Sequence, residues 1–219
     1  MNRLQVLIDK NHQWAERAEK EDPDFFDKHS ISQSPEYLWI GCSDSRVAAN
    51  VIVDLLPGEL FVHRNVANLV VNTDLNCLSV IQYAVEILKV KHIIICGHYG
   101  CGGIKSTLNR SRHGLIDNWL SHVHYTYRKY EPFFAGIRNE QDRFDRLSEL
   151  NVIEQVSNIC QTTILKDAWH HEHNLTVHGW IYRLSDGRVN DLETSIGFND
   201  NAGLILKNAT ELILKKRMI

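Results

Sequence analysis

Apolar and polar positions follow two different periods along this chain, and the change between them separates predicted helices from predicted strands. Residues 1–22 carry apolar side chains at near-helical spacing with charges between them, which is typical of an amphipathic helix. The strand-like segments are short apolar runs bounded by polar or turn residues. They are Tyr37–Gly41, Leu60–His63, His92–Gly97 and Leu175–Leu184. The third run is apolar on both faces, as expected for a strand in the middle of a covered sheet.

Helical patterns occupy most of the intervals between these strands. Asp74 is placed to cap a helix that runs to about Val90. Further helices are predicted over Val47–Leu56, over Leu115–Tyr130, over 139–172 with a break near Glu149–Asn151, and weakly over the last twenty residues. Ser185–Arg188 reads Ser-Asp-Gly-Arg, a hairpin turn signal, so Arg188–Glu193 is expected to return antiparallel to the preceding strand.

This order of elements predicts an α/β fold. Strands that alternate with helices form a mainly parallel β-sheet flanked by helices. To that core the pattern adds an N-terminal helical arm and an antiparallel edge hairpin. The 219 residues fall within the size of one domain, and no repeat or low-complexity linker divides them. We therefore expect a single domain over 1–219, with its functional site beyond the carboxyl ends of the strands.

Composition narrows the function classes. A formal net charge of -3 gives no basic surface for nucleic acid or for an acidic membrane. No apolar stretch approaches the roughly 20 residues that a membrane span needs, and the first residues lack the apolar core of a signal peptide. The five cysteines are odd in number and unevenly spaced. This pattern indicates reduced thiols and a cytoplasmic location.

Metal-ligating residues follow two of the predicted strands. Cys42 comes directly after the first strand, and His98 and Cys101 follow the third in an H-x-x-C spacing. Two thiolates and one imidazole suit zinc, and three protein ligands leave a fourth tetrahedral position open, as in catalytic sites. We expect one Zn²⁺ per chain. The alternative is that these cysteines are small core residues, which is how Cys77 and Cys96 are interpreted.

A rival ligand set remains open at this point. Cys96 shares a strand face with His98, so it could replace Cys101, although it should lie inside the sheet. Asp44 and Arg46 are open to two interpretations as well. Asp44 could cap the helix that follows it. Alternatively, Arg46 could hold the Asp44 carboxylate by charge-assisted hydrogen bonds, so that Asp44 faces the open position on the metal.

With these residues placed, the chain resembles the β-class carbonic anhydrases. The resemblance covers roughly residues 33–190 and rests on C-x-D-x-R at Cys42, Asp44 and Arg46 and on H-x-x-C-G-G at His98–Gly103. Pro57–Asn68 and His178–Trp180 match the family as well. The resemblance implies reversible hydration of carbon dioxide to bicarbonate and a proton, by attack of zinc-bound hydroxide.

The resemblance also assigns roles to individual residues. It implies that Cys42, His98 and Cys101 bind zinc and that Asp44 and Arg46 are catalytic. Gln33 matches a substrate-positioning residue of the family, and candidates for the wall of the carbon dioxide pocket are Val66, Tyr83 and Gly102. The family builds its site in a homodimer, which implies that helical arm 1–30 packs on a partner subunit and that dimers assemble into a tetramer.

A regulated subset of the family, type II, shares three further residues with this chain. Trp39, Arg64 and Tyr182 match the positions of its non-catalytic bicarbonate pocket. By that match the enzyme is inhibited by low pH and by bicarbonate, and Asp44 leaves Arg46 to bind zinc in the inactive closed state. Two other functions stay open. One is hydrolysis of carbonyl sulfide or carbon disulfide on the same scaffold, and the other is a non-catalytic structural zinc protein.

Overall fold

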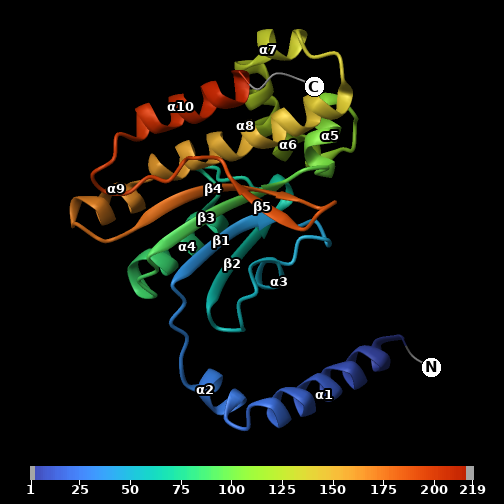
Figure 1. The fold of residues 1–219 in the computed structure, drawn as a ribbon, viewed down its shortest axis with the longest axis vertical. Coiled ribbons are helices and arrows are strands. Elements are labelled where there is room, and N and C mark those ends of the chain that lie inside the picture. The colour runs from blue at the N-terminus through green and yellow to red at the C-terminus, as the bar shows by residue number, and fades with distance from the viewer. Residues whose placement is uncertain (1–2, 216–219) are drawn as a thin grey trace. The chain divides into compact units, whose positions relative to one another are not determined.

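The computed structural model describes residues 3–215, which form two compact units divided between Ser34 and Pro35 (Figure 1). The first unit contains α1 (Arg3–Glu21) and α2 (Phe25–Ile31). The helix predicted over 1–22 is thus confirmed over Arg3–Glu21, and residues 1 and 2 lie outside the described part. Helix α2 is not predicted. Trp14 and Phe26 meet edge to face across the turn between the two helices, with ring centroids 5.8 Å apart. Neither helix buries a residue within its own unit.

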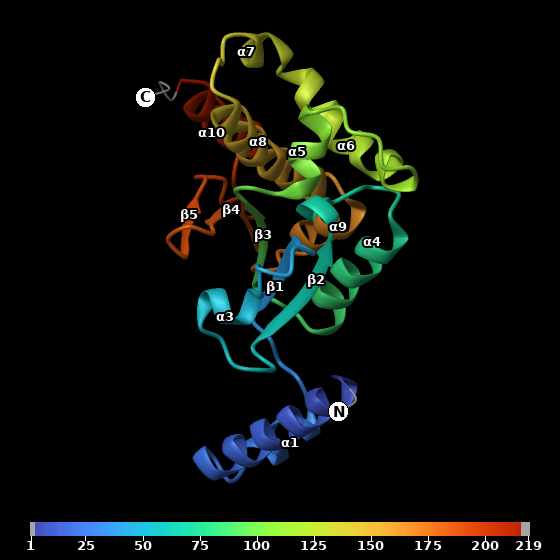
Figure 2. The same ribbon diagram turned by 90° about the vertical axis from the view of Figure 1, so that its right-hand side faces the viewer.

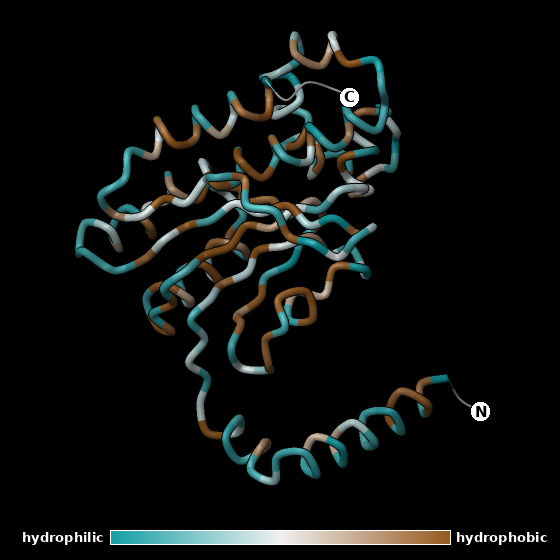
Figure 3. The backbone as a smooth tube through the Cα atoms, in the orientation of Figure 1, coloured by the Kyte–Doolittle hydropathy of each residue, from teal (hydrophilic) through white to brown (hydrophobic). Residues whose placement is uncertain are grey.

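The second unit is built on a five-stranded sheet, which confirms the predicted fold class. The strand order is β2-β1-β3-β4-β5, parallel except for the antiparallel pair β4–β5. The strands are β1 (Tyr37–Cys42), β2 (Leu60–Asn65), β3 (His92–His98), β4 (Thr176–Arg183) and β5 (Arg188–Asp191). Each lies within one or two residues of the predicted run. The central strands are hydrophobic along much of their length, as Figure 3 shows.

Helices cover both faces of this sheet. One face carries α3 (Ala49–Val53) and a small core around Trp39 and Ile94, and the other carries the main core (Figure 2). The helices of the main-core side are α4 (Leu75–Gln82), α5 (Gly102–Leu108), α6 (Leu115–Lys129), α7 (Glu131–Ala135), α8 (Glu140–Cys160), α9 (Thr163–His170) and α10 (Ala202–Lys215). None of the helices in 3–215 is both long enough and apolar enough to cross a bilayer.

Several helix boundaries differ from the prediction. The break near Glu149–Asn151 is wrong, because these polar side chains are buried and hydrogen-bonded within an unbroken α8. The chain breaks later, where Thr162 caps α9 by accepting a hydrogen bond from the Leu165 amide at 3.3 Å. The helix predicted over Val47–Leu56 shrinks to α3, which ends at a left-handed Asp54.

The predicted cap at Asp74 is confirmed: its carboxylate accepts a hydrogen bond from the Asn76 amide at 3.1 Å. The helix that it starts continues through a π-helical segment, η2 (Tyr83–Ile87), and ends before the left-handed Lys89. Two short helices, α5 and α7, are absent from the prediction because each spans less than two full turns of apolar periodicity. Of the helix predicted over the last twenty residues, α10 is described and residues 216–219 lie outside the described part.

Candidate metal centre

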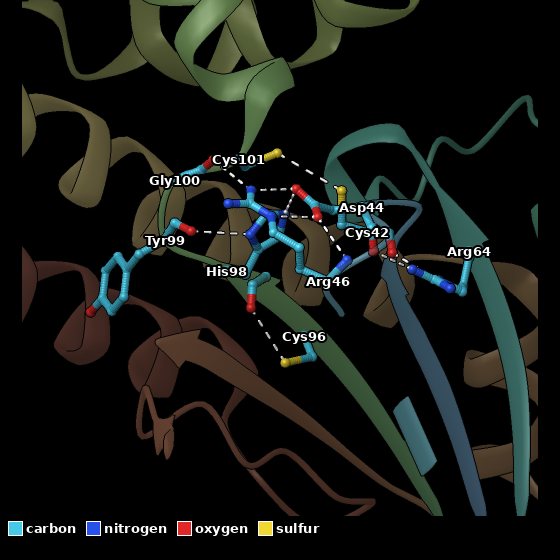
Figure 4. A network of polar contacts seen from close by, with 10 residues as sticks. Cys42, Asp44, Arg46, Arg64, Cys96, His98, Tyr99, Gly100 and Cys101 are labelled. Carbon is cyan, nitrogen blue, oxygen red and sulfur yellow. Dashed lines mark hydrogen bonds and ion pairs between the residues drawn. The ribbon is translucent and has the colours of Figure 1, made fainter. Parts of the chain in front are cut away.

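The candidate ligands meet because β1 and β3 are parallel neighbours. Cys42 is the last residue of β1 and His98 is the last residue of β3. The two strands pair in parallel up to Gly41 opposite Cys96, so their carboxyl ends lie side by side. Cys101 stands three residues after His98, at the N-cap position of α5, and turns back toward the same point (Figure 4). The edge of the sheet predicted from the sequence is therefore where the three side chains gather.

The three ligand atoms form a tight, buried group. All lie within 4.8 Å of one another, and the sulfurs of Cys42 and Cys101 are 3.9 Å apart. His98 donates a hydrogen bond from Nδ1 to the Tyr99 carbonyl at 3.1 Å, which fixes the ring. Its Nε2 atom is buried without a hydrogen-bond partner. An orphaned imidazole nitrogen beside two sulfurs is costly in a protein interior and is satisfied by a soft metal, so the donor set fits zinc.

The two sulfurs have opposite proton affinities. The Cys101 thiol donates a hydrogen bond to Cys42, and this contact lowers the pKa of the Cys42 thiol to about 4. The same contact, together with burial, raises the pKa of Cys101 well above its ordinary value. The pair therefore loses the Cys42 proton readily and releases the Cys101 proton only to a strong competitor such as a metal ion.

Cys96 is separated from this group. Its side chain is fully buried in the small core with Trp39, and its thiol donates to the Gly97 carbonyl at 3.4 Å. Burial raises its pKa far above the ordinary range of a thiol. Among the described residues, the ligand group at this edge includes Cys101 and not Cys96. Cys77 is also fully buried, so the prediction that Cys77 and Cys96 are core residues is confirmed.

Asp44 and Arg46 form a bidentate pair next to the ligands. Arg46 donates from Nε to Asp44 Oδ1 at 2.9 Å and from Nη2 to Asp44 Oδ2 at 2.7 Å. The guanidinium holds the pKa of the Asp44 carboxyl well below its usual range. Asp44 Oδ2 lies 3.8 Å from His98 Nε2. Capping is the wrong interpretation of Asp44, because α3 starts at Ala49 after an Ala48 N-cap that has no side-chain cap.

Arg64 connects β2 to the same backbone. It donates from Nε to the Cys42 carbonyl at 2.9 Å and from Nη2 to the Asp44 carbonyl at 2.6 Å. Trp39 is fully buried in the small core, and Tyr182 packs against that core from β4, opposite His98 in the register. Within the part of the chain that the structure describes, no hydrogen bond joins Arg64, Trp39 and Tyr182 to one another. They lie on three different strands.

The predicted substrate-pocket residues are only partly brought together. Val66 lies close to Gly103, which follows the ligand Cys101 by two residues. A Cβ atom added to Gly102 would have no other atom within 4 Å. Tyr83 instead stacks on Phe61, with ring centroids 5.9 Å apart, and is 45% exposed. Gln33 belongs to the N-terminal unit.

Helix α8 supplies residues of this site that the sequence reasoning missed. Asn151 donates to the Ala67 carbonyl at 3.0 Å and so holds a left-handed Ala67 (φ 67°) beside the ligands. The backbone of Ala67 also hydrogen-bonds Cys42 and lowers its pKa. Glu149, which is 1% exposed, accepts a hydrogen bond from the hydroxyl of Tyr99, whose carbonyl fixes His98. Polar residues inside a predicted buried helix are the signal that could have found them.

Removal of one ligand should remove the metal. We expect Cys42→Ala or Cys101→Ala to abolish stoichiometric zinc, because two remaining ligands hold zinc poorly. Cys96→Ala is the matched control and should retain about one zinc per chain. Zinc content of purified protein by plasma mass spectrometry measures this. Full zinc in Cys101→Ala together with its loss in Cys96→Ala would reverse the ligand assignment.

Known proteins share both the sequence and this architecture. The family model described as Carbonic anhydrase matches residues 37–189. A carbonic anhydrase of Emericella nidulans is 45% identical over 186 residues, which are 85% of this chain and 82% of the relative. A Coccomyxa beta-carbonic anhydrase in complex with acetazolamide superposes with a TM-score of 0.89 and 38% identity, over 99% of this chain and all of that one.

A second solved structure agrees. One of two tetrameric beta-carbonic anhydrases from the filamentous ascomycete Sordaria macrospora matches with a TM-score of 0.86 and 36% identity, over 90% of this chain and all of that one. The family model spans the two ligand strands and the Asp44–Arg46 pair, and the structural match covers the whole sheet. On these grounds the chain belongs to the β class of the carbonic anhydrase family.

Proposed function

We propose that this chain interconverts carbon dioxide and bicarbonate at a zinc ion held by Cys42, His98 and Cys101. The observation that carries the proposal is the bidentate Asp44–Arg46 pair beside a buried group of only three ligands, which leaves a fourth position for chemistry. When bound, zinc lowers the pKa of a coordinated water to about 7 and supplies a nucleophile at neutral pH.

The protein residues orient that chemistry. Because Arg46 keeps Asp44 ionised, the carboxylate is an obligate hydrogen-bond acceptor at neutral pH. It can accept a hydrogen bond from the O–H group of the nucleophile and so orient a lone pair of that oxygen toward carbon dioxide. Arg46 in turn donates to the Gly100 carbonyl at 3.5 Å, which ties the pair to the loop that carries Cys101. The open space around Gly102 and the apolar Val66 suit a small apolar substrate.

The Asp44 carboxylate also argues against a purely structural zinc. A closed structural site needs a fourth protein ligand. Here both carboxylate oxygens accept hydrogen bonds from Arg46, so Asp44 is engaged elsewhere.

Asp44→Asn tests the proposed role of the dyad. The amide keeps the shape and loses the charge, so we expect unchanged zinc content and melting temperature with carbon dioxide hydration reduced by roughly 10²-fold or more. Asp54→Asn, an exposed position at the end of α3, is the matched control. Stopped-flow hydration assays on zinc-quantified protein measure the effect. Turnover of Asp44→Asn close to that of the control would refute the dyad, and absence of turnover in the zinc-loaded wild type would refute the reaction.

We propose further that low pH and bicarbonate inhibit the enzyme, as in the type II subset. Support comes from Arg64, which donates to the carbonyls of both Cys42 and Asp44. An anion that drew Arg64 away would free this backbone. Asp44 Oδ2, already 3.8 Å from His98 Nε2, could then leave Arg46 for the fourth position. Bicarbonate shifts this equilibrium only by binding the closed state more tightly.

Trp39→Phe and Tyr182→Phe test the regulatory pocket, because each removes one hydrogen-bond donor and keeps an aromatic ring. We expect wild-type activity to fall more steeply with decreasing pH than a one-proton titration, and bicarbonate to enhance the fall. Both variants should weaken the bicarbonate effect several-fold. Tyr37→Phe, at the first residue of β1, where the ring stacks on His92, should not. If bicarbonate inhibited all three variants to the same extent, the proposed pocket would be excluded.

We propose a homodimer that pairs into a tetramer, with arm 1–30 packed on the partner. Apolar side chains of α1 are exposed within the N-terminal unit, including Leu7 at 61% and Ile8 at 48%. Such a face is stable in water when another surface covers it. The main unit likewise exposes Leu75 at 78% and Ile87 at 63%. The Sordaria macrospora relatives are tetrameric.

All five cysteines are free, which supports a reducing compartment such as the cytoplasm.

Charges on the apolar face of α1 should disrupt this assembly. We expect the double variant Leu7→Lys, Ile8→Lys to sediment as a smaller species than the wild type, because two ammonium groups cannot be buried without partners. Gln13→Lys, an exposed polar position of the same helix, should leave the assembly intact. An unchanged sedimentation coefficient for the double variant would rule out a role for this face.

A further inference from the structure

A second group of metal-ligating side chains lies between β2 and α4. His63, Asp74 and Cys77 each present a ligand atom within 4.8 Å of the others. None of the three belongs to the first centre. His63 is 6% exposed and the Cys77 side chain is fully buried, whereas Asp74 is partly open to solvent. The geometry points to a second zinc-type site at this place, and we propose that it binds Zn²⁺ or Co²⁺.

The fold presents the three side chains from two elements. Asp74 is the N-cap of α4 and Cys77 is the third residue of that helix, so both project at its start. His63 lies on β2, two residues after Phe61, which stacks on Tyr83, the residue directly after α4. Alternation along β2 therefore turns His63 toward α4 as well.

The three groups do not bond to one another. Among the described residues, no hydrogen bond joins His63, Asp74 and Cys77, although they face each other at close range. Ligand atoms around one zinc lie about 3–4 Å apart, given bonds of about 2.0–2.3 Å. Small side-chain rotations thus close the group on an ion. Cys77 gives up its thiol proton to solvent as the metal–sulfur bond forms.

The state of His63 suits a metal ligand. Its Nε2 atom lies 3.3 Å from the Nδ2 atom of Asn65, a donor that also bonds the Leu69 carbonyl at 2.7 Å. Because Nε2 accepts this hydrogen bond, the ring is neutral, which is the form in which histidine binds a metal, and an ion at Nε2 would take the place of the Asn65 donor. A Cys–His–Asp hydrolytic triad is the other chemistry of these residue types. It requires a nucleophile that substrate can reach, and Cys77 is fully buried.

Occupancy of this site would bear on the first one. Asn65 pairs with Cys42 in the register of β2 and β1, and its side chain holds the turn through both the Leu69 amide and the Leu69 carbonyl at 2.7 Å. A metal on His63 would fix the strand directly before this turn. We therefore infer a structural role for the second ion, separate from the reaction at the first.

Metal counting tests the proposal. Zinc-loaded wild-type protein under anaerobic reducing conditions is dialysed against excess Co²⁺, and total metal per chain is measured. We expect about two metal equivalents in the wild type and about one in Cys77→Ala and in His63→Phe. Cys160→Ala, another buried thiol that is not part of either ligand group, should retain two. One equivalent in the wild type, or two in Cys77→Ala, overturns the proposal.

Cobalt spectroscopy gives an independent readout that does not depend on activity. The Cys42→Ala variant loses stoichiometric metal at the first centre, and the thiolate-to-cobalt absorption that it shows on addition of Co²⁺ reports the second site where it depends on Cys77. We expect that absorption in Cys42→Ala and its loss in the double variant Cys42→Ala, Cys77→Ala. If Cys42→Ala does not fold, the wild-type metal count alone decides, since one equivalent at saturating Co²⁺ excludes a second site.

Discussion

Parallel pairing of β1 with β3 is the constraint on which the site depends. Because the two strands run in the same direction and are adjacent, their last residues, Cys42 and His98, emerge at one edge of the sheet. The H-x-x-C spacing then needs only one tight turn, at a left-handed Gly100, to bring Cys101 to the same point. A different strand order would separate ligands that are 56 residues apart in sequence.

The contrast among the five cysteines shows how environment selects ligands. Burial raises the pKa of Cys77 and Cys160 to about 12, with a further contribution from the Asp74 carboxylate at Cys77, so these thiols stay protonated in the absence of a metal. Cys42 is buried too, yet the hydrogen bond from Cys101 lowers its pKa to about 4. The neighbour, not the degree of burial, separates a thiol that is ionised before a metal arrives from one that must lose its proton to the metal.

Much of this arrangement is predictable from the sequence, and the failures have physical causes. Apolar runs and polar strand ends locate β1, β3 and the ligands, because burial of a strand and metal ligation each require particular residue types. The break expected at Glu149–Asn151 fails because periodicity equates polar with exposed, whereas these side chains are satisfied by Arg146, Tyr99 and Ala67. Hydrogen-bond partners that are distant in sequence cannot be recognised from the residues that surround a position. The spread of Trp39, Arg64 and Tyr182 over three strands is beyond local patterns for the same reason.

Helix α8 consequently restricts how this chain can evolve. Its polar residues hydrogen-bond particular groups outside the helix: Asn151 the Ala67 carbonyl, Gln155 the Val70 amide at 2.9 Å and Asn158 the Val70 carbonyl at 3.0 Å. Each bond satisfies a backbone group in the turn beside the ligands. An apolar replacement of any one would strand a buried polar group, a loss of about 1–3 kcal/mol. Substitutions at these positions of α8 are therefore tolerated only together with compensating changes in residues 67–70. The helix and the turn constrain each other's sequence.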